Sequence, residues 1–300
     1  MNNIAVIGAG TMGNGIAHVF AQAGFTVQLV DLNANQLEKA LATITKNLER
    51  QVQKNILPAN AVADILKRIH PVHQIKEGIT EAGLIIEAAT ENESVKLRIF
   101  HELDENALPD AILASNTSSI SITKIAAATR RPSQVIGMHF MNPVPLMKLV
   151  EVINGYATSP VVTDKITALT RQLGKTPCLV NDYPGFISNR ILMPMINEAI
   201  ISLQEGVASV EVIDTIMKLG MAHPMGPLQL ADFIGLDTCL AILKVLQEGF
   251  GNPKYAPAAL LVNMVAAGNL GVKSGAGFYT YSSGSKELVV SENFKKPFKA

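Results

Sequence analysis

One histidine and one glutamate in this chain are spaced so that they could form an acid–base pair. His139 closes an apolar run that begins at Val135 and is typical of a buried strand, and Glu151 lies inside a second such run, residues 149–153. Two prolines between the runs interrupt helix and sheet, so we expect the chain to turn there. If the runs return antiparallel, positions 139 and 151 are equidistant from the centre of the turn and can pair.

A carboxylate on one imidazole nitrogen fixes the tautomer and raises the basicity of the other nitrogen, which suits a general base. Two plainer interpretations of His139 stay open at this point. One is a buried ion pair with Glu151, and the other is a histidine whose hydrogen bonds go to the backbone. The elements that position the two residues therefore matter.

Composition limits the classes of protein that need to be considered. A chain of 300 residues with 48% hydrophobic content can bury a large core, and its length favours two domains. The 25 basic and 25 acidic residues give a net charge of zero, so no basic surplus indicates a nucleic-acid partner.

The cysteines, histidines and apolar segments indicate a cytoplasmic protein without a metal site. Cys178 and Cys239 lack metal-type spacing and are expected as reduced thiols. His70 and His73 are more typical of a strand entry than of a metal site. The amino terminus lacks the basic leading region of a signal peptide, and no segment reaches the ~20 uninterrupted apolar residues of a membrane span.

A glycine fingerprint opens the chain and indicates a dinucleotide site. The strand-like residues 4–8 lead directly into Gly8-Ala9-Gly10-Thr11-Met12-Gly13, a helical pattern follows to Ala23, and a second strand ends at Asp31. This strand–glycine loop–helix–strand–acid order is the context that a G-x-G-x-x-G fingerprint requires. An ordinary strand–helix turn is the alternative for the glycines.

Each residue of the fingerprint has a physical task. Gly8 allows the tight turn, Gly10 lets a pyrophosphate approach the backbone, and Gly13 permits close packing of the helix. The free amides at the helix start then meet the phosphates. Asp31 would accept hydrogen bonds from a ribose diol and repel a 2′-phosphate, so NAD is favoured over NADP.

Strand–helix alternation continues and places polar residues at successive strand ends. Glu91 follows the strand-like residues 83–89, and Asn116 and Ser118 follow residues 111–115. In an open α/β sheet, ligands bind beyond the carboxyl ends of the strands, so these residues and His139 are expected at the cofactor edge. Capping of a helix that starts near residue 121 is the alternative for Asn116 and Ser118.

From Tyr183 onward the alternation stops and helical apolar periodicity dominates. Residues 186–204 are predicted to form a long helix with Asn189 in its first turns. Ser209 is expected to cap the next helix, Pro227 suits the first turn of another, and residues 256–268 predict a further one. The predicted fold is therefore α/β, with a Rossmann-type dinucleotide-binding domain (1–184), a smaller all-α domain (185–283) and a loosely ordered tail (284–300).

Several segments together resemble the L-3-hydroxyacyl-CoA dehydrogenases, in particular the short-chain bacterial 3-hydroxybutyryl-CoA dehydrogenases. The resemblance covers about residues 2–283, and the histidine segment together with PGFISNR is highly specific. The matching segments are GAGTMG at 8–13, EAATENESVK at 87–96, SNTSSISIT at 115–123, GMHFMNPVPLMKLVEVI at 137–153, DYPGFISNRIL at 182–192, HPMGPLQLADFIGLDT at 223–238 and KSGAGFYTY at 273–281.

The resemblance implies a role for each matching position. His139 matches the family's catalytic base and Glu151 its paired carboxylate, while Ser118 and Asn189 match contacts to the reacting oxygen. The remaining matches concern the cofactor and the substrate. Asp31, Glu91, Lys96 and Asn116 match dinucleotide contacts, Asn142 matches a substrate-facing asparagine, and Lys54 and Ser119 lie where coenzyme A contacts are expected.

The resemblance further implies an acyl-CoA substrate, NAD as the cofactor and a homodimer formed through the helical domain. Three alternatives remain. The first is a sugar-acid dehydrogenase (of the L-gulonate type) on the same architecture, and the second is a non-catalytic NAD-binding or crystallin-like protein. The third is a β-hydroxyacid dehydrogenase with a lysine base, against which the histidine segment argues.

Overall fold

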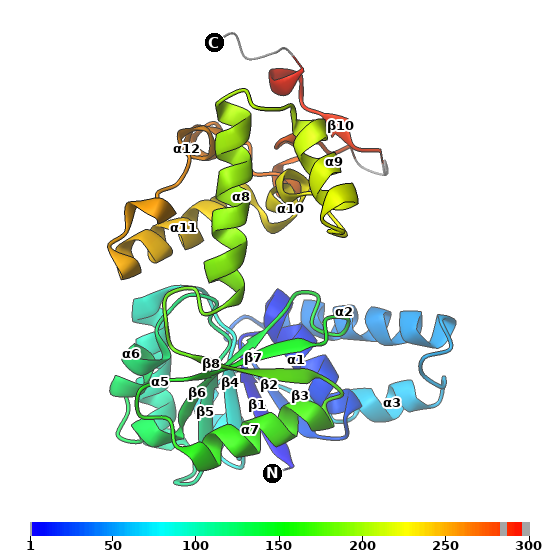
Figure 1. Ribbon diagram of the computed structural model, residues 1–300. Helices are drawn as coiled ribbons and strands as arrows, with labels where there is room; N and C mark the ends of the chain where they lie inside the picture. Colours follow the sequence, from blue (N-terminus) through cyan, green and yellow to red (C-terminus); the bar gives the residue numbers. More distant parts are fainter. Residues whose placement is uncertain (1, 283–286, 296–300) are drawn as a thin grey trace. The chain divides into compact units, whose positions relative to one another are not determined.

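The chain forms two compact units that meet in sequence between Tyr183 and Pro184. A computed structural model describes residues 2–282 and 287–295. We call residues 2–183 the first unit and the described residues from 184 onward the second unit (Figure 1).

The first unit is built on one eight-stranded sheet with the order β3-β2-β1-β4-β5-β6-β7-β8. All neighbouring strands are parallel except β6 and β7, which are antiparallel. The β1 strand lies between β2 and β4, so the strand order reverses beside the glycine fingerprint, where doubly wound sheets bind their ligands. The strands are β1 (Asn3–Ile7), β2 (Thr26–Val30), β3 (Ile69–Val72), β4 (Leu84–Glu87), β5 (Ile112–Ser115), β6 (Val135–Phe140), β7 (Leu149–Asn154) and β8 (Thr176–Asn181).

Helices cover both faces of this sheet (Figure 1). One core joins alternate strand residues such as Ile4, Leu84 and Ile136 to apolar side chains of α1, α2 and α7. Because strand side chains alternate between faces, their sequence neighbours point to the opposite side, where α6 packs on β6. The helices are α1 (Thr11–Gln22), α2 (Ala34–Gln53), α3 (Ala61–Leu66), α4 (Ile75–Ile79), α5 (Glu93–Asn106), α6 (Ile122–Ala127) and α7 (Pro160–Gln172), with the short η1 (Pro132–Gln134).

The second unit is helical and has its own apolar core. Met193, Ile196 and Ile200 of the long first helix lie in that core, as their spacing predicted. Ser209 caps α9 through the amide of Val212, and Pro227 stands at the start of α10, as expected. The helices are α8 (Ser188–Gln204), α9 (Val210–Gly220), α10 (Pro227–Ile234), α11 (Leu236–Phe250) and α12 (Ala259–Ala266), with the short η2 (Pro253–Tyr255), η3 (Val272–Ser274) and η4 (Glu292–Phe294).

The end of the chain corrects two expectations. The second unit is not all-α, because β9 (Tyr279–Thr280) pairs antiparallel with β10 (Val289–Val290). The tail was expected to be loosely ordered, but Val290 and Ser291 are buried and the Ser291 hydroxyl donates to the carbonyl of Gly277 at 2.8 Å. Residues 284–286 and 296–300 of the predicted tail lie outside the described residues.

Within residues 2–282 and 287–295, no helix is both long and apolar enough to cross a membrane.

Candidate active site

His139 and Glu151 face each other across the antiparallel strands β6 and β7. They are direct partners in the register, and His139 Nδ1 lies 2.7 Å from Glu151 Oε2. Directly opposite residues project to the same face of a sheet, and both side chains are buried, 9% and 2% exposed. The antiparallel pairing predicted from the sequence is therefore present.

The pairing defines what His139 can do chemically. With the carboxylate on Nδ1, the neutral imidazole carries its proton on Nδ1 and its lone pair on Nε2, the nitrogen suited to take a proton. Nε2 is thereby left available to exchange a proton with a bound substrate, while Glu151 holds the ring orientation.

The glycine loop has the backbone geometry that its sequence predicted. Gly8 has φ +99°, a conformation that side chains disfavour, and it begins the turn out of β1. A Cβ at Gly13 would lie 1.7 Å from the carbonyl oxygen of Gly8, so only glycine lets α1 start this close to the loop.

The start of α1 is suited to a phosphate-bearing cofactor. Its N-cap is Gly10, which offers no side-chain acceptor to the amides of the first turn, and a Cβ at Gly10 would meet no atom within 4 Å. Exposed amides at a helix start attract anions. The Asp31 carboxylate, at the end of β2, accepts the Ala9 amide at 2.9 Å and so fixes the loop to the neighbouring strand.

The buried carboxylate of Glu87, at the end of β4, binds one donor from α5 and one from the end of β5. Its side chain is fully buried at the end of β4, where it accepts hydrogen bonds from Lys96 Nζ at 2.7 Å and from the Ser115 hydroxyl at 2.7 Å. Lys96 is itself 1% exposed and also lies 3.3 Å from Glu91 Oε2. The predicted contact of Lys96 with the dinucleotide stays a prediction; in the structure Lys96 joins Glu87 to Glu91.

Glu91 gathers the hydroxyl groups that follow β5. Its Oε1 accepts from the hydroxyls of Thr117 at 2.6 Å, Ser118 at 3.2 Å and Ser119 at 3.0 Å. Burial alone would raise the pKa of Glu91, but Lys96 and these donors outweigh it and lower the pKa below its ordinary value. Glu91 therefore remains ionised and orients Ser118.

Asn116 and Ser118 do not cap a helix, so the capping interpretation is wrong for both. Ser121 caps α6 instead, by accepting the Lys124 amide at 3.2 Å. Asn116 Oδ1 accepts the Phe140 amide at 2.9 Å and thereby joins the end of β5 to β6, next to His139.

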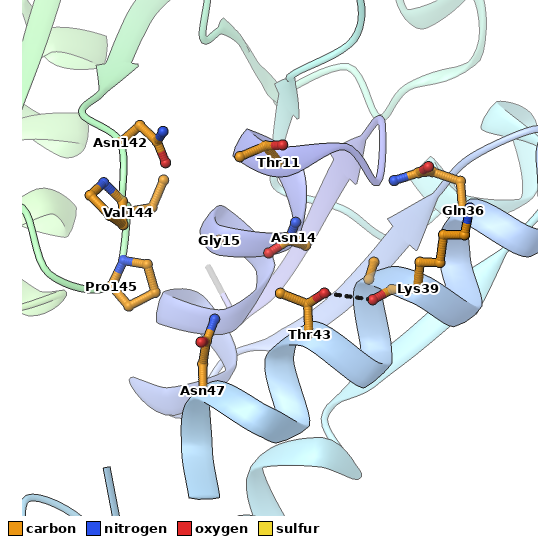
Figure 2. Close-up of a pocket in the computed structure, with 12 residues that line it drawn as sticks. Thr11, Asn14, Gly15, Gln36, Lys39, Thr43, Asn47, Asn142, Val144 and Pro145 are labelled. Atoms are coloured by element: carbon orange, nitrogen blue, oxygen red, sulfur yellow. Dashed lines mark hydrogen bonds between the residues drawn. The ribbon is translucent and has the colours of Figure 1, made fainter. Parts of the chain in front are cut away.

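Asn142 lines a pocket of about 290 Å³ between α1, α2 and the turn after β6 (Figure 2). Polar side chains of α2, including Lys39, Thr43 and Asn47, form the opposite wall. Lys54 follows the last turn of α2 and is exposed, outside the residues that line this pocket.

Asn189 lies in the second unit, in the first turn of α8, and is buried. Its proposed contact with the reacting oxygen stays a prediction. No cluster of potential metal ligands is found among the described residues.

Glu87 and Thr117 also belong to this group of side chains and were not predicted from the sequence. A signal for Glu87 was present, because a glutamate that ends the buried run Leu84-Ile85-Ile86 must find a partner there. Its partner Lys96 was identified only by resemblance.

Comparison with known proteins identifies the family of both units. Residues 3–183 match the family described as 3-hydroxyacyl-CoA dehydrogenase, NAD binding domain, and residues 185–281 match its C-terminal domain. The chain belongs to the 3-hydroxyacyl-CoA dehydrogenase family. Its first unit is the NAD-binding domain, and the fold predicted from the sequence, a Rossmann-like domain followed by a helical domain, is confirmed.

Relatives match almost from end to end. The chain is 54% identical over 281 residues to the 3-hydroxybutyryl-CoA dehydrogenase of Bradyrhizobium diazoefficiens, covering 94% of this chain and 96% of that protein. A probable 3-hydroxybutyryl-CoA dehydrogenase of Bacillus subtilis is 53% identical, with 94% and 98% covered. The crystal structure of the (S)-3-hydroxybutyryl-CoA dehydrogenase of Ralstonia eutropha superposes with a TM-score of 0.92 at 49% identity, covering 94% of this chain and all of that one.

Proposed function

We propose that this member of the family catalyses the NAD-dependent interconversion of L-3-hydroxybutyryl-CoA and acetoacetyl-CoA. The observation that carries the proposal is the buried His139–Glu151 pair, with Nδ1 and Oε2 2.7 Å apart. The names of full-length relatives at 53–54% identity support the short acyl chain.

In this proposal His139 takes the hydroxyl proton on Nε2 during oxidation and returns it during reduction. Glu151 holds the imidazole in the required tautomer and stabilises the imidazolium. NAD, when bound at the glycine loop, supplies the hydride acceptor. Ser118, oriented by Glu91, donates a hydrogen bond to the substrate's reacting oxygen, and Asn189 supplies a second such contact.

We further propose that the pocket beside Asn142 receives part of the acyl-CoA chain. Support comes from its position, because it is bounded by the turn that links the His139 and Glu151 strands and by the first turns of α1. Ser119 and Lys54 are proposed as further contacts for coenzyme A.

We also propose that the protein forms a homodimer through the second unit. Large apolar side chains of this unit are exposed, among them Leu219 (82%), Met221 (61%) and Phe233 (59%). Sedimentation equilibrium of the wild type and of Leu219→Asp tests this; a wild type that stays monomeric would refute it.

The reaction is tested by following acetoacetyl-CoA reduction with NADH and, in parallel, with NADPH. We expect fast oxidation of NADH and little oxidation of NADPH, because Asp31 disfavours a 2′-phosphate. Free acetoacetate serves as the control substrate for a dehydrogenase that does not need coenzyme A. Folded protein that binds NADH but turns over none of the acyl-CoA would contradict the proposal.

A further inference from the structure

A buried lysine outside the predicted site contacts the turn between the two acid–base strands. Lys175, which lies between α7 and β8, is 8% exposed. Its Nζ donates to the carbonyls of Val144 at 2.6 Å and of Met147 at 2.7 Å. Both acceptors belong to the turn that connects β6, with His139, to β7, with Glu151.

Among the described residues Lys175 has no acidic partner, which makes its burial informative. No ion pair of Lys175 is found within residues 2–282 and 287–295. Removing an ammonium from water is costly unless hydrogen bonds compensate, and burial accordingly lowers the pKa of Lys175. A methionine would fill the same space without this cost. The hydrogen bonds to the two carbonyls are therefore what a charged side chain provides at this position and a methionine would not.

The same turn also packs against α1. A Cβ at Gly15 would lie 2.8 Å from the Val144 Cβ, so the turn touches the backbone of the cofactor helix directly. Within the turn, the amides of Leu146 and Met147 both donate to the Pro143 carbonyl at 3.0 Å. The carbonyls of Val144 and Met147 accept Lys175 Nζ instead.

We propose that Lys175 is a positioning residue that holds the turn 142–147 against α1 and thereby fixes Asn142 and the pocket wall relative to the cofactor loop. The inference deepens the proposed function, on which its kinetic part rests. Hydrogen bonds from one ammonium to two carbonyls three residues apart restrain the turn more firmly than apolar packing, which has no direction.

The kinetic test is Lys175→Met, with Lys165→Met, an exposed lysine of the neighbouring α7, as the matched control. We expect Lys175→Met to bind NADH with an unchanged Kd, since the glycine loop is not altered. Its KM for acetoacetyl-CoA should rise and its kcat should fall. Together these changes should lower kcat/KM by roughly tenfold or more, because small displacements of substrate contacts slow the reaction. Lys165→Met should match the wild type.

A structural role alone would have a different signature. It would lower the melting temperature and the active fraction while leaving the KM for acetoacetyl-CoA unchanged. Folded Lys175→Met with wild-type kcat and KM would also refute the inference. If Lys175→Met does not fold, Lys175→Gln, which keeps two N–H donors but no charge, replaces it under the same criteria.

A second measurement needs no turnover. The chain contains no tryptophan, so Met147→Trp places a single fluorophore in the turn at a side chain that is 42% exposed. We expect lower anisotropy and stronger acrylamide quenching when Lys175→Met is added, and identical signals would refute the inference. An inactive wild type would refute the proposed function alone, and this fluorescence comparison would still decide whether Lys175 holds the turn.

Discussion

The two units each bury a carboxylate network, and the two networks are built from different partners. In the first unit Glu87 contacts the ammonium of Lys96, which also approaches Glu91. In the second unit Asp214 accepts the amides of Leu228 and Gln229 and the Tyr279 hydroxyl.

Asp232 completes the second network, in which the part of the chain that the structure describes supplies no cation. It accepts the amides of Phe278 and Tyr279 and the Tyr281 hydroxyl, and no ion pair to Asp214 or Asp232 occurs among the residues that the structure describes. Burial raises the pKa of Asp232 to about 6, whereas the pKa of Glu91 is lowered. The first network keeps a carboxylate ionised beside the serines of the site; the second fastens helix α10 and the chain end.

The comparison predicts that a change at the acid–base pair alters turnover, whereas the loss of a buried partner in either network alters stability. The largest effect is expected for His139→Gln, which removes the proposed base. Its kcat should fall by ~10²–10⁴-fold or more, with NADH affinity and melting temperature unchanged. Steady-state assays and NADH titration measure this, and normal turnover would remove His139 from the mechanism.

Lys96→Met tests whether the first network also carries stability. Because it leaves Glu87 buried without its cation, we expect a loss of about 3–5 kcal/mol in the free energy of unfolding. Lys124→Met is the control, since Lys124 pairs with Glu93 at the surface, where such pairs contribute about 0–1 kcal/mol. Urea denaturation measures the free energy of unfolding of both variants. Equal losses would show that the buried Lys96–Glu87 pair stabilises the fold no more than the surface Lys124–Glu93 pair.

Asp214→Asn tests the second network. The asparagine side chain presents an N–H where the carboxylate accepted three donors, so stability should fall by about 1–3 kcal/mol. Glu211→Gln on the exposed side of the same helix should change little. Thermal melts report the loss, and the kcat of the folded enzyme should match the wild type. A reduced kcat with unchanged stability would contradict the structural role given to Asp214.

Acidification should affect the two units in opposite directions. Burial lowers the pKa of His18 in α1 from 6.5 to about 4, so below pH 6.5 the unfolded chain binds a proton that the folded chain does not. Lowering the pH from 7 to 5 should therefore destabilise the first unit by about 2 kcal/mol. The folded pKa of Asp232 is raised from 3.8 to about 6, so in this range the folded state takes up the extra proton.

The second unit should accordingly gain about 1 kcal/mol between pH 7 and pH 5. Hydrogen exchange followed by mass spectrometry, corrected for intrinsic rates, measures the opening free energy of each unit separately. His18→Gln should abolish most of the acid sensitivity of the first unit. If the opening free energy of both units falls on acidification, the predicted opposite response of the two units is refuted.

The sequence predicted much of this arrangement where one local pattern sufficed. His139 and Glu151 could be paired because two prolines marked the turn and the strand period placed both on one face. Gly8, Gly13 and Asp31 were located by a short contiguous fingerprint, and Ser209 and Pro227 by the chemistry of helix starts.

Long-range partners were not predictable in the same way. In the sequence nothing distinguishes Lys175 from other lysines. Its two acceptors are backbone carbonyls, which every residue has, so they leave no signal in the sequence. Asp214 and Asp232 meet donors up to 65 residues away that only the packed helices bring together. The chain end was expected to be loose because it is rich in Lys and Ser, yet burial of Val290 fixes part of it.

The order of strands in the sheet has a consequence for self-association. Its two outer strands, β3 and β8, each contain a proline, Pro71 and Pro177. Proline has no N–H to offer a further strand and is tolerated where that side faces solvent. Each edge strand therefore lacks one N–H that a strand of another copy would need. This disfavours edge-to-edge aggregation, to which open sheets are prone at high concentration. Replacement of either proline by valine would create a longer pairing edge and should promote aggregation during refolding.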